Sequence, residues 1–248
     1  MSKNDTQTIG IIPARYDSVR FPGKPLVNIR GKTMIQRVYE RASQAVELDQ
    51  VVVATDDERI QRVVASFGGQ VILTRRDHPS GTDRVAEAAL QYPAAVLIMN
   101  IQGDEPFIFP EQIDYLVRFI RDRPTLEIAT LAKQITQRNL IENPNIVKVV
   151  TNIESQALYF SRSPIPYQRD ATLNTIYRKH IGLYIYRATV LPRITAMVPH
   201  QLEQTERLEQ LRWLANGLKI GVAETSLESM AIDHPEDLKR LEKFMDQL

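Results

Sequence analysis

The sequence predicts an α/β protein with a mainly parallel, mixed sheet that is flanked by helices. Strand-like and helix-like segments alternate through the first half of the 248 residues. Short apolar runs at 51–54 and 95–99 are typical of strands that are buried on both faces, as in parallel sheets. The hydrophobic content of 43% is enough for a substantial core.

The elements of the first half follow from the spacing of apolar residues. Apolar residues recur at helical spacing around Ile35 and Val38 and again around Ile60 and Val64. The pattern predicts strands at 9–13, 51–55, 71–73 and 96–101, and helices at 33–45, 58–67, 83–91 and 111–120.

The second half is less regular, and we expect it to form a smaller lobe, roughly residues 150–200, within one domain that spans 1–248. Strands are predicted at 146–150, 157–160, 181–186 and 220–223, with a proline-containing polar stretch at 163–175. Helical periodicity returns at 208–215 and ends at Asn216 and Gly217, a good C-cap pair. A last helix is expected from Pro235.

Composition excludes several classes of protein. Thirty-one Lys and Arg against thirty Asp and Glu give a net charge of +1, which argues against nucleic-acid binding. There is no cysteine, so disulfides and thiolate chemistry are excluded. The first residues lack the apolar core of a signal peptide, and no apolar run reaches the ~20 residues of a spanning helix. We therefore expect a cytoplasmic protein with no membrane partner.

The first loop (residues 13–24) carries Arg15, Arg20 and Lys24 directly after an apolar strand. Ligands of open α/β sheets bind at such strand ends, and clustered cations suit a polyanion. Ser18 stands where a P-loop needs its first glycine, and the glycines do not form a dinucleotide-binding fingerprint. The loop therefore predicts phosphate binding by side chains, with an ordinary solvated basic loop as the alternative.

A second polar segment, Asn100 to Pro106, follows the most apolar strand of the chain. Magnesium in nucleotide sites takes one or two carboxylates together with substrate phosphates, which suits Asp104 facing the first loop. In the alternative interpretation Asp104 only caps its own turn.

Other polar segments have simpler local explanations. Asp233 and Glu236 have the spacing of a helix capping box, and the turn at Ser80 to Thr82 is suited to open a helix. Acidic residues at 203, 206 and 209 are spaced as on one solvated helix face. His180 beside a strand is more typical of a structural residue than of a catalytic one.

Taken together, several segments resemble the 3-deoxy-manno-octulosonate (Kdo) cytidylyltransferases of Gram-negative bacteria. The resemblance extends over nearly the whole chain, and its motifs occur in order: Ile-Ile-Pro-Ala-Arg, Phe-Pro-Gly-Lys-Pro-Leu, Val-Ala-Thr-Asp-Asp-Glu-Arg-Ile, His-Pro-Ser-Gly-Thr-Asp-Arg, Asn-Ile-Gln-Gly-Asp-Glu-Pro, Leu-Tyr-Phe-Ser-Arg-Ser-Pro-Ile-Pro, His-Ile-Gly-Leu-Tyr, Leu-Glu-Gln-Leu-Arg and Ile-Asp-His-Pro-Glu-Asp-Leu. Each motif is weak alone, but the ordered set is highly specific.

The resemblance implies a Rossmann-like nucleotide-diphospho-sugar transferase fold, a homodimer, and the reaction of CTP with Kdo to give CMP-Kdo and pyrophosphate for lipopolysaccharide biosynthesis. It also implies Mg²⁺ as the cofactor, with Asp104 and Asp233 as ligands, which replaces the capping interpretation of Asp233. Arg15 and Lys24 would join these two carboxylates as the catalytic set. Nucleotide contacts are expected from Pro13, Ala14, Arg15, Ser18, Arg20, Lys24, His78, Ser80, Gly81, Thr82 and Gln102, and sugar contacts from Gln102, Arg162, Arg169, His180, Tyr184, Glu209 and Gln210.

Two positions depart from the pattern of the family, since His234 replaces the usual threonine and Ala231 the usual glycine. Neither change removes an expected ligand, but both affect the support of Asp233. Transfer to 8-amino-Kdo or another acidic sugar remains an alternative. A nucleotide-binding protein without activity is disfavoured because Arg15, Lys24, Asp104 and Asp233 are all present.

Overall fold

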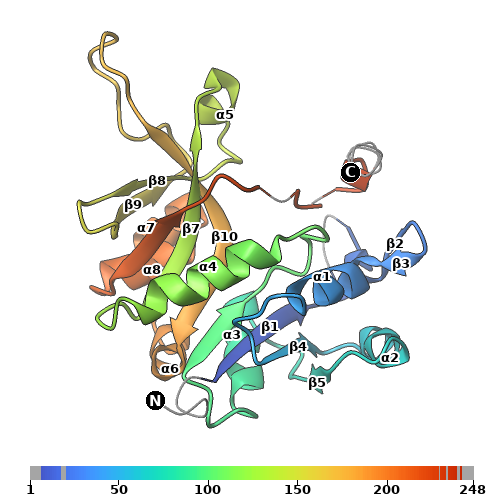
Figure 1. The fold of residues 1–248 in the computed structure, drawn as a ribbon. Helices are drawn as coiled ribbons and strands as arrows, with labels where there is room; N and C mark the ends of the chain where they lie inside the picture. Colours follow the sequence, from blue (N-terminus) through green and yellow to red (C-terminus); the bar gives the residue numbers. More distant parts are fainter. Residues whose placement is uncertain (1–6, 18–20, 229, 233, 239–240, 242–248) are drawn as a thin grey trace. The chain divides into compact units, whose positions relative to one another are not determined.

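The computed structural model describes residues 7–17, 21–228, 230–232, 234–238 and 241 (Figure 1). The chain divides into two compact units. Unit 1 comprises Met1–Asp114 and Glu228–Leu248, and unit 2 comprises Tyr115–Leu227. No helix in the described part of the chain has the length and apolar character needed to cross a membrane.

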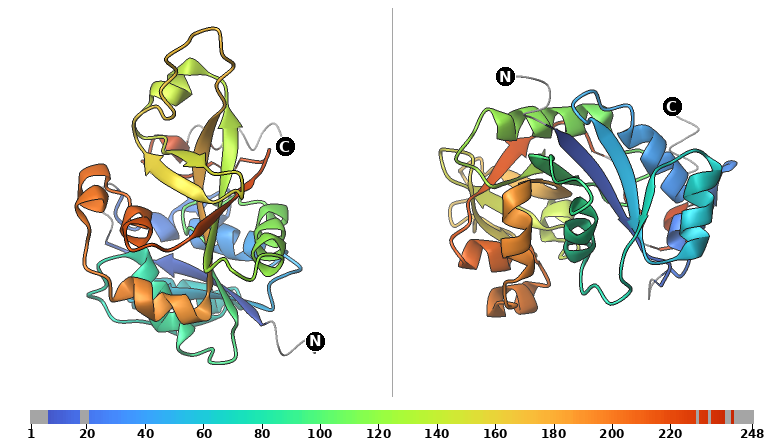
Figure 2. Two further views of the ribbon diagram at one scale, coloured as in Figure 1. Left: turned by 90° about the vertical axis from the view of Figure 1, so that its left-hand side faces the viewer. Right: turned by 90° about the horizontal axis from the view of Figure 1, so that it is seen from below.

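Unit 1 contains a parallel sheet in the order β6-β1-β4-β5. Its strands are β1 (Thr8–Ala14), β4 (Gln50–Thr55), β5 (Val71–Leu73) and β6 (Leu97–Asn100). The helices α1 (Met34–Ala42), α2 (Glu58–Ser66) and α3 (Gly81–Ala89) alternate with them and pack against this sheet (Figure 2). The predicted parallel sheet with its crossover helices is confirmed, because the buried runs of β1, β4 and β6 are apolar on both faces.

Short elements that the periodicity did not predict lie between β1 and α1. They are the 3₁₀ turn η2 (Lys24–Leu26) and the small hairpin of β2 (Asn28–Ile29) and β3 (Lys32–Thr33). Two-residue strands leave no periodic signal. Helix α4 (Pro110–Arg121) follows β6 along the chain, as predicted.

Unit 2 is built around β7 (Ile128–Ile135), which pairs with β10 (Tyr177–Arg187) antiparallel and with β11 (Ile220–Glu224) parallel. Strand β8 (Lys148–Thr151) pairs with β10 and with β9 (Ala157–Ser161). The sequence patterns missed β7 altogether, because Ala129, Thr130 and Ala132 interrupt its apolar run. They also placed the start of β10 four residues late.

The helical elements of unit 2 are short. They are α5 (Arg138–Glu142), η3 (Ala188–Val190), α6 (Leu191–Thr195), α7 (Gln201–Glu206) and α8 (Gln210–Ala215). The single helix face expected for the acids at 203–209 is wrong, because Arg207 has φ of 55° and ends α7 in a left-handed cap. These acids are also not all simply solvated, since the Glu203 carboxylate accepts two hydrogen bonds from the Arg212 guanidinium at 2.7 and 2.6 Å.

The polar stretch at 163–175 contains no helix or strand and forms a long loop between β9 and β10 (Figure 1). Near the C-terminus, Asp237, Leu238 and Leu241 are helical, and the rest of the predicted last helix lies outside the described residues. Asp233 of the predicted capping box lies outside them as well, while the backbone N–H of His234 donates to Asp237 at 2.9 Å.

Candidate active site

A cavity of about 270 Å³ lies at the carboxyl edge of the parallel sheet in unit 1. Strands β1 and β6 run side by side, with Ile11 opposite Asn100, so the segments that follow both strands meet at this edge. A Cβ on Gly103 would lie 3.0 Å from the carbonyl oxygen of Pro13, so glycine permits this close approach. The lining residues are Pro13, Ala14, Arg15, Lys24, Pro25, His78, Pro79, Ser80, Gly81, Arg84, Gln102, Gly103 and Asp104.

The structure therefore brings together most of the residues expected to bind the nucleotide. Thr82 lies beside them, in the first turn of α3, and is buried. The predictions for Ser18, Arg20 and the metal ligand Asp233 lie outside the described residues.

The ammonium of Lys24 links three distant parts of unit 1. It donates to the Asp104 carboxylate at 2.6 Å and to the carbonyl oxygen of Ile232 at 3.0 Å. The N–H of Ile232 in turn donates to the carbonyl oxygen of Asp104 at 2.9 Å. The Asp104 side chain thus faces a cation rather than simply capping its own turn, and the chain neighbour of Asp233 is hydrogen-bonded to Asp104.

The wall of the cavity at the start of α3 is fixed by local capping. Ser80 is the N-cap, as predicted, and its hydroxyl oxygen accepts from the N–H of Asp83 at 3.2 Å. The imidazole of His78 is buried and lies 2.5 Å from the Glu87 carboxylate. His78 is therefore held in the wall and cannot turn freely.

Arg84 is a cavity residue to which the sequence analysis assigned no role. It is 4% exposed, and its guanidinium donates to the Thr74 hydroxyl at 2.5 Å and lies 3.4 Å from Asp56. The signal that could have identified it is helical spacing, because Arg84 follows the N-cap Ser80 by one turn and shares its side of the helix.

In unit 2, four of the expected sugar-binding residues lie on β10 and at the start of α8. The ring of His180 packs 5.3 Å from that of Tyr184, which packs 5.4 Å from Trp213 of α8. Burial raises the pKa of Tyr184 well above its ordinary value, and the nearby Glu209 carboxylate acts in the same direction. Gln210 is buried at the start of α8.

Arg162 follows β9 and is held by backbone carbonyls. Its Nε donates to the carbonyl oxygen of Glu206 at 2.6 Å and its Nη1 to that of Pro144 at 3.0 Å. The Glu206 carboxylate accepts from the N–H of Arg162 at 2.9 Å and from the Ser161 hydroxyl at 2.6 Å. Much of the fork of Arg162 is therefore already engaged.

The buried Lys148 reinforces this anchor. Its ammonium donates to the carbonyl oxygens of Asn143, Ile146 and Arg162, and burial lowers its pKa. Arg169 differs, because it is exposed and lines a hollow in the long loop between β9 and β10. Of the two arginines expected to bind the sugar, Arg169 is thus exposed, whereas the guanidinium of Arg162 is engaged by backbone carbonyls.

Within the described ranges, no group of three His, Asp or Glu side chains is placed to hold a metal ion. The Asp104 carboxylate is 26% exposed and is an oxygen donor of the kind that magnesium takes in nucleotide sites, where substrate phosphates supply further ligands.

Cations, a capped helix start and a carboxylate around one cavity at the edge of a parallel sheet define a nucleotide-binding α/β protein. The comparisons agree. The family model described as "Cytidylyltransferase" matches residues 9–220. The chain therefore belongs to the cytidylyltransferase family, as a nucleotidyltransferase of the 3-deoxy-manno-octulosonate cytidylyltransferase group, to which its relatives are assigned at about 50% identity.

One such relative, from Bacteroides thetaiotaomicron, is 51% identical over 96% of this chain and 97% of its own length. Another, from Pelobacter propionicus, is 50% identical over 94% and 96%. The solved structure of a CMP:2-keto-3-deoxy-manno-octonic acid synthetase complexed with CTP has a TM-score of 0.94 and 45% identity, with 98% and 99% of the two chains covered. The 4-diphosphocytidyl-2C-methyl-D-erythritol synthase from Anaerococcus prevotii, at 12% identity and a TM-score of 0.64 over 98% and 97%, shares the fold alone.

Proposed function

We propose that the protein transfers the CMP group of CTP to Kdo, giving CMP-Kdo and pyrophosphate. The observation that carries the proposal is the cavity in which Arg15, Lys24 and Asp104 meet the start of α3. Relatives at about 50% identity over nearly the full chain support Kdo as the acceptor.

In the proposed reaction the anomeric hydroxyl of the sugar attacks the α-phosphorus in line. The bond to the bridging oxygen breaks, pyrophosphate leaves, and the hydroxyl proton passes to water. Arg15 and Lys24 neutralise the triphosphate and orient it. Lys24 exchanges its contact with Asp104 for a phosphate oxygen, which frees the carboxylate as CTP arrives.

Asp104 and Asp233 are the residues that we propose hold magnesium. Asp104 lies in the cavity, and Asp233 follows Ile232, whose N–H donates to Asp104 at 2.9 Å. When bound, the metal would stabilise negative charge on the attacked phosphate and the leaving pyrophosphate. Removal of divalent metal with a chelator should stop pyrophosphate release, and addition of Mg²⁺ should restore it.

For the sugar we propose Gln102, Arg162, Arg169, His180, Tyr184, Glu209 and Gln210. An arginine fork matches the carboxylate of Kdo, and amide and carboxylate groups bind its hydroxyls. Because Arg162 is engaged by backbone carbonyls and Arg169 is exposed, Arg169 is the better fork for the carboxylate.

A homodimer is the assembly that we propose. The long loop between β9 and β10 exposes apolar side chains, with Tyr167 86% and Leu173 64% exposed, as does Leu158 of β9 at 62%. A second copy of the chain would cover this surface. Light scattering should give the mass of a dimer, and Tyr167→Glu should shift it toward the monomer. We propose that the reaction takes place in the cytoplasm, as a step that supplies lipopolysaccharide biosynthesis.

The decisive experiment measures pyrophosphate release with CTP, UTP or ATP, each offered with Kdo, 8-amino-Kdo or sialic acid. We expect turnover with CTP and Kdo above all other pairs. A preference for 8-amino-Kdo or sialic acid would change the proposed acceptor sugar but not the proposed transfer of CMP. Binding of CTP without turnover on any sugar would refute the proposed activity.

A further inference from the structure

The ring of Tyr16 lies at the base of the first loop and closes it. The N–H of Gly23 donates to the carbonyl oxygen of Tyr16 at 2.9 Å. Gly23 has φ of 73°, and a Cβ there would lie 3.2 Å from three atoms of the Tyr16 side chain. The two ends of the loop are therefore packed on each other, with Arg15 directly before one contact residue and Lys24 directly after the other.

On Tyr16 lies the guanidinium of Arg59, which comes from the first turn of α2. The guanidinium carbon is 3.3 Å from the ring centroid, close enough for a cation–π contact. The Asp57 carboxylate holds this guanidinium by accepting two hydrogen bonds, from Nε at 2.9 Å and from Nη2 at 2.6 Å. Asp57 is also the N-cap of α2, so its own position is fixed.

The charges of this pair support each other. The hydrogen bond to Arg59 holds the pKa of Asp57 below its ordinary value, and the same bond raises the pKa of Arg59. Because Asp57 takes the Nε and Nη2 edge of Arg59, that edge is not available to fork a phosphate. The flat face of the Arg59 guanidinium instead contacts the ring of Tyr16 in the first loop.

We propose that Arg59, stacked on Tyr16 and oriented by Asp57, positions the first loop so that Arg15 and Lys24 meet the triphosphate together. The inference rests on the proposed binding of CTP by that loop, and Arg59 acts through Tyr16 as a positioning residue. A second tether of the loop, from Arg76 to Asp17 at 3.3 Å, has side chains 80% and 75% exposed. Such exposed pairs contribute little. The Arg59–Asp57 pair that supports the stack on Tyr16 is less exposed, at 48% and 14%, so the stack is the stronger of the two side-chain tethers.

The test compares Arg59→Ala, Tyr16→Leu and the double variant in steady-state kinetics with saturating Kdo. Because the Arg59 side chain is 48% exposed, we expect KM for CTP to rise about two- to fivefold, the range that a cation–π contact at an exposed site supplies, with kcat unchanged. The double variant should be no worse than either single variant, because both remove one contact. Calorimetric affinity for CMP, which lacks the β- and γ-phosphates, should fall less than the affinity for CTP.

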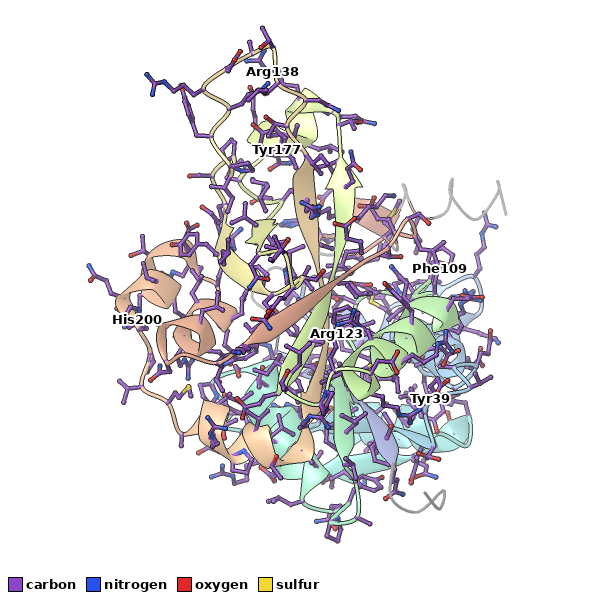
Figure 3. The ribbon with its side chains drawn as sticks, turned by 60° about the vertical axis from the view of Figure 1, so that its left-hand side comes forward. Tyr39, Phe109, Arg123, Arg138, Tyr177 and His200 are labelled. Atoms are coloured by element: carbon purple, nitrogen blue, oxygen red, sulfur yellow. The ribbon has the colours of Figure 1, made fainter. Side chains whose placement is uncertain are left out.

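Two further variants separate this role from general stability. Tyr16→Phe keeps the ring and should restore a KM close to that of the wild type. Arg138→Ala is the matched control, because Arg138 is an exposed arginine on α5 of unit 2 that also pairs with one carboxylate, Glu142 at 2.7 Å (Figure 3). It should leave KM for CTP unchanged, and urea unfolding should show that each variant is folded.

Lys24→Ala distinguishes failure of this inference from failure of the proposed binding of CTP. If Lys24→Ala raises KM for CTP while Arg59→Ala and Tyr16→Leu do not, the positioning role of Arg59 is wrong and the role of the loop stands. If none of the three changes KM, the loop does not bind the triphosphate. Additive effects in the double variant, or equal losses for CTP and CMP, would also overturn the inference.

Discussion

Acid should destabilise the protein through His180, a residue that the folded chain keeps neutral. Its ring packs 5.0 Å from Phe160 and 5.3 Å from Tyr184, and its Nε2 lies 3.0 Å from the Thr130 hydroxyl. Burial in this cluster, and next the charge of Lys179, lower the pKa of His180 from 6.5 to about 3. Protonation is thus strongly disfavoured in the folded state.

The sign and size of the effect follow from proton linkage. Between pH 6.5 and pH 3 the unfolded chain binds a proton at His180 that the folded chain does not, so stability falls as the pH falls through this window. With a pKa of 6.5 in the unfolded chain and about 3 in the folded chain, the free energy of unfolding is about 2 kcal/mol lower at pH 5 than at pH 7.5. Because the side chain keeps partial contact with solvent, we expect about 1–2 kcal/mol.

Urea unfolding at pH 7.5 and pH 5.0 measures this loss for the wild type and for His180→Phe. Phenylalanine keeps an aromatic ring in the cluster, and the Thr130 hydroxyl retains the carbonyl oxygens of Ile181 and Leu183 as acceptors at 3.0 and 2.9 Å. The variant should lose about 1–2 kcal/mol less between the two pH values. The exposed His200, exchanged for asparagine, is the control. Equal pH dependence of the wild type and His180→Phe would refute the reasoning.

Three other substitutions test the site and the packing. Asp104→Asn should abolish pyrophosphate release while the urea midpoint stays near that of the wild type, and wild-type rates would exclude Asp104 as a metal ligand. Arg169→Ala should raise KM for Kdo by about tenfold or more without loss of stability, as expected for a charged hydrogen bond. Arg162→Ala should in addition unfold at a lower urea concentration. The opposite pattern would make Arg162 the residue that binds the sugar carboxylate and Arg169 the structural one. Gly221→Ala should cost about 1–3 kcal/mol in urea unfolding, because its Cβ would lie 2.4 Å from Leu126, and unchanged stability would contradict that packing.

The sequence predicted the parallel sheet of unit 1 well, because its signals are local. The runs at 51–55 and 96–101 are apolar on both faces, and the helices between them show regular periodicity. In unit 2 the decisive features are not local. The central strand β7 pairs along its two edges with β10 and β11, and its first five residues are buried. The polar Thr130 is accepted there because its hydroxyl is hydrogen-bonded to carbonyl oxygens of β10, and the apolar pattern is lost.

The site was predictable to the extent that its residues follow strand ends or helix starts. Arg15, Ser80 and Asp104 do so, and they line one cavity. The stack on Tyr16 was not predictable in this way, because its partner Arg59 comes from another element. Glu206 and Glu209 lie at the ends of two different helices because Arg207 between them adopts a left-handed conformation. Residues other than glycine seldom adopt it, so the sequence did not predict the break.

The contacts of Lys24 show how the fold turns separate weak signals into one site. Its ammonium reaches Asp104, 80 positions away, and Ile232, 208 positions away. The buried side chain of Ile232 lies in a cluster with Ile29 and Met34, so the segment that precedes Asp233 is anchored in the core of unit 1. In the metal site that we propose, Asp104 and Asp233 share one ion, and such a pair needs an anchor because each misplaced ligand weakens coordination. The hydrophobic cluster around Ile232 would supply that anchor in addition to its contribution to stability.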